Sequence, residues 1–213
     1  MPIVFDGPFQ IFKVAEMGSY SNNGYVLADP ATKEAYLIDA PDQIERLLDE
    51  AKDFRVKAVL VTHTHPDHVA GYAQLKQLTD LPVAVHADDV AKFPGTPDLL
   101  ISHGDDLTIG STRIRVLHTP GHTPGAICLH LDGALISGDT LFPGGPGRTF
   151  SPDDFKQVVA SITTHLHPMA DGTLVLPGHG ADTTMGESKR DYAVFAGKSH
   201  PDDLHDHVSW LNS

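Results

Sequence analysis

Four side chains able to bind a metal ion lie within six residues, in the segment THTHPDHVAG. His63 and His65 are two positions apart, so an extended backbone directs both to the same side. Pro66 is tolerated in a helix only in its first turn, which suits a chain that changes direction there. Asp67 and His68 then fall at the start of the next helix. We expect these residues to bind a metal ion where a strand ends and a helix begins.

Three later segments carry further ligand types in one shared context. HTPGHTPG contains His122, SGDTLF contains Asp139 and LPGHG contains His179, each at a strand end followed by a glycine-rich turn. Side chains placed in this way are fixed by the sheet yet open to solvent, as a catalytic metal site requires. One histidine alone is more often solvated or hydrogen-bonded than metal-bound. The HxHxDH pattern with three such segments favours a metal site.

The elements that must position these residues alternate between strands and helices. Short apolar runs separated by turn-forming residues predict a strand meander over the first 40 residues. Ser151 as N-cap and Pro152 after it predict a helix start. The other predicted elements are helices over 42–53, 67–80 and 151–166, strands over 56–62, 81–86, 113–119, 126–132, 134–139 and 173–178, and one or two helices in the last thirty residues. This order predicts an α/β fold with sheets covered by helices.

The composition is that of a globular protein, with 213 residues, 40% hydrophobic and 20% charged. We expect a single domain over residues 1–213. The net charge of −13 argues against a nucleic-acid partner. No stretch has the apolar length needed to cross a membrane, and the N-terminus does not read as a signal peptide. We therefore expect a cytoplasmic protein with a small-molecule substrate and neither nucleic acid nor membrane as partner.

The cysteine and several other histidines lie in sequence contexts that are less specific for a function. Cys128, the single cysteine, lies in the apolar run AICLHL, which is typical of a small buried hydrophobe. His86 and His118 follow predicted strands and could approach the site, although core or supporting roles are expected. The tail SHPDDLHDHVSW, with His200, His205 and His207, could bind metal adventitiously, but we interpret it as a solvated helix start.

HxHxDH followed by the later His, Asp and His resembles the metallo-β-lactamase superfamily, from about residue 10 to about residue 185. The resemblance implies a four-layer αββα sandwich with the site at one edge between the sheets. It also implies ligands for two divalent metal ions, namely His63, His65 and His122 for one ion and Asp67, His68 and His179 for the other. Asp139 is implied to bridge the two ions together with a water or hydroxide.

The residue types at positions 139 and 65 narrow the choice of branch within the superfamily that the sequence resembles. Aspartate at 139 differs from the β-lactamases whose second metal takes a cysteine there. Histidine at position 65 differs from the flavodiiron proteins, whose motif resembles HxExDH, with glutamate at that position. HTPGHTPG, SGDTLFPGGPGRT and LPGHG resemble glyoxalase II, the hydroxyacylglutathione hydrolases. Those enzymes usually carry a C-terminal helical domain that recognises glutathione, whereas only 34 residues follow His179.

This resemblance implies hydrolysis of a thioester or an ester, with the metal-bridging hydroxide as nucleophile. Asp67 and Asp139 are the predicted catalytic residues, because Asp67 can also orient the nucleophile. Zinc is the expected metal at such a histidine-rich site, with iron and manganese as alternatives. Arg148, in GGPGRT, could hold an anionic group of the substrate or form a structural ion pair.

Other functions remain open on the same residues. An iron-dependent persulfide dioxygenase would use one iron on His63, His122 and Asp139. That family typically has Asp-Phe after Gly-Arg-Thr, whereas Phe150 here follows Thr149 directly, which favours hydrolysis. A lactonase is a third option. Metal storage without catalysis fits poorly with ligands on open strand ends.

Overall fold

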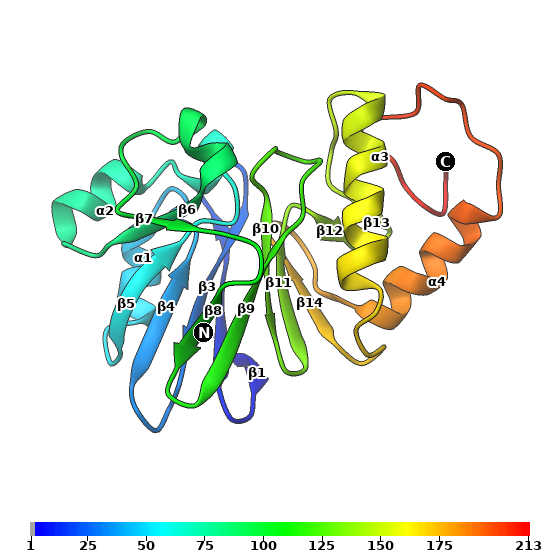
Figure 1. The fold of residues 1–213 in the computed structure, drawn as a ribbon. Helices are drawn as coiled ribbons and strands as arrows, with labels where there is room; N and C mark the ends of the chain where they lie inside the picture. Colours follow the sequence, from blue (N-terminus) through cyan, green and yellow to red (C-terminus); the bar gives the residue numbers. More distant parts are fainter. Residues whose placement is uncertain (1–2) are drawn as a thin grey trace.

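The computed structural model describes residues 3–213, and two β-sheets facing each other form its centre (Figure 1). The first sheet contains seven strands in chain order: β1 (Ile3–Asp6), β2 (Gln10–Met17), β3 (Asn22–Ala28), β4 (Glu34–Ile38), β5 (Arg55–Leu60), β6 (Val83–His86) and β7 (Leu99–Ile101). The second has the order β15-β14-β11-β10-β9-β8, with bounds β8 (Asp106–Ile109), β9 (Thr112–His118), β10 (Ile127–Leu131), β11 (Ala134–Gly138), β14 (Leu174–Pro177) and β15 (Thr183–Thr184). A separate hairpin joins β12 (Leu141–Phe142) and β13 (Gly145–Pro146).

Helices cover the outer face of each sheet. Helices α1 (Ile44–Glu50) and α2 (Tyr72–Leu78) lie on the first sheet, and α3 (Pro152–Ser161) and α4 (Met185–Ala196) lie on the second (Figure 1). One buried apolar cluster fills the space between the sheets, and two others fill the spaces between each sheet and its helices. The predicted four-layer αββα sandwich is therefore confirmed. None of the helices in residues 3–213 combines the length and apolar character required to span a membrane.

Most of the predicted elements are present. Strands β1 to β4 pair antiparallel in sequence, as the predicted meander requires. The Ser151 hydroxyl accepts the Asp154 amide and Pro152 takes the first helical position, so α3 starts where its signals indicated. It continues as a π-helical turn, η3 (Ile162–Leu166).

The helix predicted over residues 67–80 is present only as α2, so its predicted start is wrong. The chain instead forms a 3₁₀ turn, η1 (Pro66–His68), then breaks before α2. The break has a tertiary cause, because the Ala40 amide donates to the His68 carbonyl and the Gly71 amide donates to the Ala40 carbonyl. These two bonds take the place of helical ones, and a side chain at Gly71 would collide with the Pro41 carbonyl.

The last thirty residues contain one helix, α4, whereas the interpretation of the tail included a further helix start. Helix α4 is capped by a reciprocal pair, Thr184 and Glu187, and residues 197–213 form no helix. The helix start interpreted in the tail is therefore wrong. Trp210 is fully buried in the cluster between the second sheet and its helices, and residues 197–209 lead to it through turns and irregular backbone.

Cys128 lies in the buried cluster between the second sheet and its helices. Burial raises the pKa of its thiol to about 11, so the reactive thiolate is scarce at neutral pH. We expect the native protein to be inert to a thiol-specific reagent such as dithionitrobenzoate, and the unfolded protein to react with one equivalent. Spectrophotometric titration in buffer and in guanidinium measures both. Rapid labelling of the native protein, with loss of activity, would contradict a purely packing role.

Candidate metal centre

The predicted ligands meet at one edge of the sandwich because the carboxyl ends of its parallel strands meet there. Strands β4, β5 and β6 run parallel in the first sheet, and β11 and β14 run parallel in the second. The ligands follow these strand ends or lie in the loop after β9: His63, His65, Asp67 and His68 after β5, His122 after β9, Asp139 after β11 and His179 after β14.

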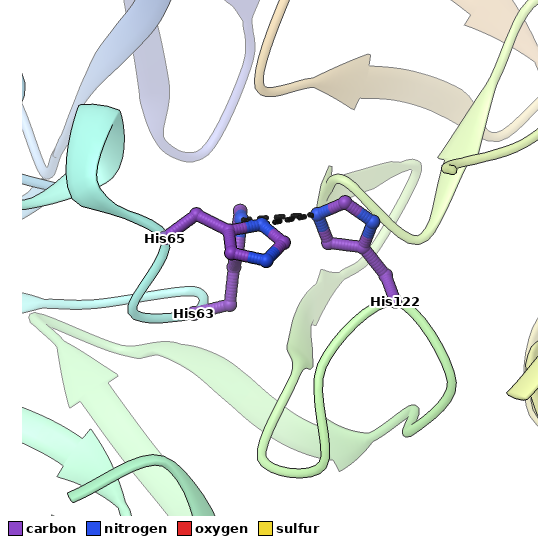
Figure 2. A group of neighbouring side chains, drawn as sticks. All are labelled: His63, His65 and His122. Atoms are coloured by element: carbon purple, nitrogen blue, oxygen red, sulfur yellow. Dashed lines mark hydrogen bonds between the residues drawn. The ribbon is translucent and has the colours of Figure 1, made fainter. Parts of the chain in front are cut away.

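Three histidine nitrogens form a small triangle at this edge (Figure 2). His63 Nε2 lies 3.1 Å from His65 Nδ1, and His65 Nδ1 lies 2.8 Å from His122 Nε2. The third side, from His122 Nε2 to His63 Nε2, measures 3.2 Å. Nitrogens on one tetrahedral zinc are roughly 3.3–3.4 Å apart, given Zn–N bonds of about 2.0–2.1 Å. We call this set the first trio, and its size suits one such ion.

Asp67, His68 and His179 form a second trio beside it. His68 Nε2 lies 3.2 Å from His179 Nε2, and Asp67 Oδ2 lies 3.5 Å and 3.1 Å from these two nitrogens. Asp139 stands between the trios, because its Oδ2 is 3.6 Å from both His122 Nε2 and His179 Nε2. The structure thus brings all seven predicted ligands together, in the two groups that the resemblance implied.

Four of the five histidines have the ring nitrogen that points away from the cluster bound to an oxygen. His68 Nδ1–H donates to Asp39 Oδ2 at 2.8 Å, and His122 Nδ1–H donates to the Arg148 carbonyl at 2.8 Å. His179 Nδ1–H donates to the Tyr20 carbonyl at 3.0 Å. His63 Nδ1 lies 3.2 Å from the Thr62 hydroxyl, which itself donates to Asp39. These bonds leave each Nε2 lone pair free for a metal, as in known metal sites.

The electrostatics of the cluster also favour metal-binding protonation states. Burial, and then neighbouring His68, hold the pKa of His63 well below its ordinary value, and burial with His122 lowers the pKa of His65 to about 4. Burial would raise the pKa of Asp139, but the charge and hydrogen bond of His68 together with the charges of His122 and His179 outweigh it and keep that pKa below its usual range. Neutral imidazoles and charged carboxylates are the forms that bind metals.

His68 and His179 are the exceptions among these histidines. Burial lowers the pKa of His179, but its hydrogen bond to Asp67 and the charge of Asp139 outweigh burial and raise it. Burial also lowers the pKa of His68, but the Asp139 and Asp39 carboxylates outweigh burial and raise that pKa well above its ordinary value. A cation in the second trio would displace that proton, so metal binding there is expected to release a proton.

An unpaired atom supplies an independent test of whether a metal fits. Within residues 3–213, Asp139 Oδ1 is buried and has no hydrogen-bond partner, although His68 Nε2 lies 3.4 Å from it. A buried carboxylate oxygen without a hydrogen bond is costly, and a cation between the two trios would satisfy it. The donors are imidazole nitrogens and carboxylate oxygens, which suit zinc, iron or manganese. The residues present therefore fit two divalent cations.

Sequence reasoning missed two polar residues that touch the ligands. Asn22 Nδ2 donates to Asp67 Oδ2 at 2.8 Å from the start of β3. Asp39, after β4, fixes the ring of His68 and, through Thr62, that of His63. Neither lies near HxHxDH in the chain. The position of Asp39 at the end of a predicted strand was the one signal that could have identified it.

Asp89 is a third residue that was missed, and it joins the two loops of the first trio. Its buried carboxylate accepts from the Gly125 amide at 2.7 Å and from the Thr64 amide and the Thr123 hydroxyl, both at 2.9 Å. Thr64 lies between two ligands of the first trio, and Thr123 follows the third. Asp89 therefore sets how close these loops come, although it touches no ligand side chain.

We expect Asp89→Asn to weaken metal binding at the first trio by about 10–100-fold, as is typical of groups that orient ligands. The amide of asparagine would face backbone N–H donors that need an acceptor. Within residues 3–213, the hydrogen bonds of the Asp89 carboxylate go to the loops of the first trio, so the second trio should keep its affinity. Competition with a chromophoric chelator resolves the two sites, and Asp80→Asn, the same change at an exposed carboxylate after α2, is the control. Equal weakening of both sites would instead indicate general damage to the fold.

His86 and His118 lie outside the two trios. Their rings stack on each other at 4.0 Å, with Asp88 nearby. His118 Nε2–H donates to the Pro124 carbonyl at 2.8 Å, and His86 Nδ1 accepts the Asp88 amide. These contacts support the loop that carries His122, in keeping with the supporting roles expected for them.

Arg148 forms the ion pair that was one of its two predicted roles. Its Nε donates to Asp206 Oδ1 at 2.6 Å, and its guanidinium lies over the Phe150 ring at 5.1 Å. Its carbonyl accepts from His122, as described above. The alternative role, holding an anionic group of the substrate, remains untested by these contacts.

Comparison with known proteins identifies relatives of similar sequence and similar fold. Residues 18–197 match the family model described as metallo-beta-lactamase superfamily. The chain is 33% identical over 190 residues to the hydroxyacylglutathione hydrolase GloC of Haemophilus influenzae, covering 78% of this chain and 90% of that one. Among solved structures, ETHE1 from Myxococcus xanthus is 32% identical with a TM-score of 0.74, covering 88% of this chain and 86% of that chain. TTHA1623 in a di-iron-bound form is 31% identical with a TM-score of 0.72, covering 84% and 97%.

The chain belongs to the metallo-β-lactamase superfamily, and its two mixed sheets flanked by helices are the fold of that superfamily. This fold binds divalent metals at histidine and aspartate clusters, and such clusters are present here. Its relatives include hydroxyacylglutathione hydrolases.

Proposed function

We propose that the protein is a binuclear metal-dependent hydrolase of thioesters or esters, similar to glyoxalase II and acting on a small molecule in the cytoplasm. The observation that carries the proposal is the pair of adjacent three-ligand sets joined by Asp139, whose Oδ2 is 3.6 Å from a nitrogen of each. Similarity to GloC supports the hydrolytic class. We propose zinc as the metal, although the di-iron form of TTHA1623 shows that a similar chain holds iron.

Two divalent cations, when bound, supply a nucleophilic hydroxide near neutral pH and an electrophile for the carbonyl under attack. The chain's own residues organise that chemistry. Asp139 lies against both trios, so it sets their separation. The Asp67 carboxylate is held by Asn22, which leaves its remaining lone pairs to bind and to orient the attacking oxygen. The fixed rings of the histidines keep the site preorganised before substrate arrives.

A second candidate is a persulfide dioxygenase with one iron on His63, His122 and Asp139. Similarity to ETHE1 of Myxococcus xanthus supports it. The three side chains do converge, since His122 Nε2 is 3.2 Å from His63 Nε2 and 3.6 Å from Asp139 Oδ2. All seven ligand types also occur in the persulfide dioxygenase family, so the ligand set alone does not separate the two functions. Phe150 directly after Thr149 and the similarity to GloC favour the hydrolase.

Elemental analysis of the purified protein, with assays of thioester hydrolysis and of oxygen consumption, separates the two functions. We expect about two metals per chain, because seven ligands exceed the four that one tetrahedral zinc needs. We also expect hydrolysis of thioesters without oxygen uptake. One iron per chain with oxygen uptake on a persulfide would establish the dioxygenase instead.

A further inference from the structure

A cavity of about 440 Å³ opens directly beside the proposed metal centre. One side of it is formed by His122, Asp139 and His179. The opposite wall is formed by the β12–β13 hairpin and by residues 207–209 of the C-terminal tail. A volume of this size suits a small organic ligand, so this is where the part of a substrate that extends beyond its reacting carbonyl would lie.

The tail is held in place as a permanent part of this wall. Asp206 and Thr149 exchange backbone hydrogen bonds of 3.1 and 3.2 Å, and the Trp210 amide donates to the Gly144 carbonyl at 2.8 Å. The Trp210 ring is fully buried and packs against Tyr192 of α4 at 5.2 Å. Gly145 has no side chain, which leaves room for the Val208 carbonyl.

The walls of the cavity are largely apolar, with few charges left to bind a substrate. Phe142, Pro143, Pro146 and Val208 contribute apolar surface, and the glycines between them expose backbone. Among residues 3–213, its wall contains no lysine, and Arg148 is its one arginine. Asp206 pairs with Arg148, which also stacks on the exposed ring of Phe150. The net charge of −13 further opposes anions.

We infer that this cavity selects substrates whose non-reacting part is compact, apolar and free of negative charge. This inference rests on the proposed function and gives its substrate class: thioesters of small uncharged thiols in preference to those of glutathione, whose two carboxylates would meet no lysine and no unpaired arginine in the described wall. The Arg148–Asp206 pair is the specificity-determining element, because Asp206 offsets the one permanently cationic side chain in the wall formed by the described residues.

The test compares benzyl mercaptan and glutathione thioesters of the same acid, using the metal-loaded protein. We expect kcat/KM to favour the benzyl thioester by at least about tenfold, the scale of discrimination that an apolar pocket provides. Asp206→Asn removes the negative charge that offsets Arg148 and should shift the ratio towards glutathione by roughly two- to fivefold, the scale of an exposed ion pair. Asn tolerates the positive φ of residue 206, so the tail should keep its course.

Asp202→Asn changes the net charge equally within the same exposed tail and should leave the ratio unchanged. A readout independent of turnover is the binding of the matching non-hydrolysable thioethers, followed by fluorescence of Trp210, the single tryptophan. Preference for glutathione that Asp206→Asn does not alter would overturn the inference and leave the hydrolase proposal intact. Hydrolysis of neither thioester would overturn both.

Discussion

Asp139→Asn is expected to remove most of the activity, by more than the roughly 10–100-fold typical of groups that only orient ligands. The Asp139 carboxylate lies 3.6 Å from a nitrogen of each trio. Its negative charge also offsets the positive charge of His68 within the site. Asparagine keeps the shape but offers one neutral oxygen, so it can satisfy only one of the two trios. Turnover and metal content per chain, measured on the same preparation, should fall together.

Asp132→Asn provides the matched control, because it makes the same chemical change at an exposed carboxylate in the β10–β11 turn. It should retain native turnover and native metal content. If Asp139→Asn retained both as well, the bridging role of Asp139 would be wrong, whatever the fold.

Removal of metal is expected to abolish activity while the fold persists. Three apolar clusters form the core without any contribution from the ligands, so circular dichroism should hardly change in a chelator. Zinc at about 100 times its dissociation constant stabilises the native state by about 2.7 kcal/mol per site. For a chain of this length that corresponds to a Tm rise of about 5–10 °C per site.

Thermal unfolding followed in chelator, and again after zinc is restored, measures this difference. Activity should return together with the higher Tm. An identical Tm in both conditions would show that the cluster does not hold zinc, and complete unfolding in chelator would show that the core depends on the metal.

The seven ligands were predictable because their signals are local. HxHxDH lies within six residues, and Asp139 and His179 each directly follow a glycine at the end of a recognisable strand. The residues that support them were not predictable, because Asp39, Asn22 and Asp89 act through contacts between distant segments. The break before α2 has the same origin, since it depends on backbone bonds to Ala40. The course of the tail depends on the burial of Trp210, which no local pattern indicates.

Each trio takes two ligands from the loop after β5 in the first sheet and a third from the second sheet. Neither half of the chain therefore contains a complete trio by itself. Capture of either ion must follow the docking of the two sheets, and so comes late in folding. Two fragments divided between β7 and β8 would each lack a complete site, and high-affinity metal uptake would report the moment at which they reassociate.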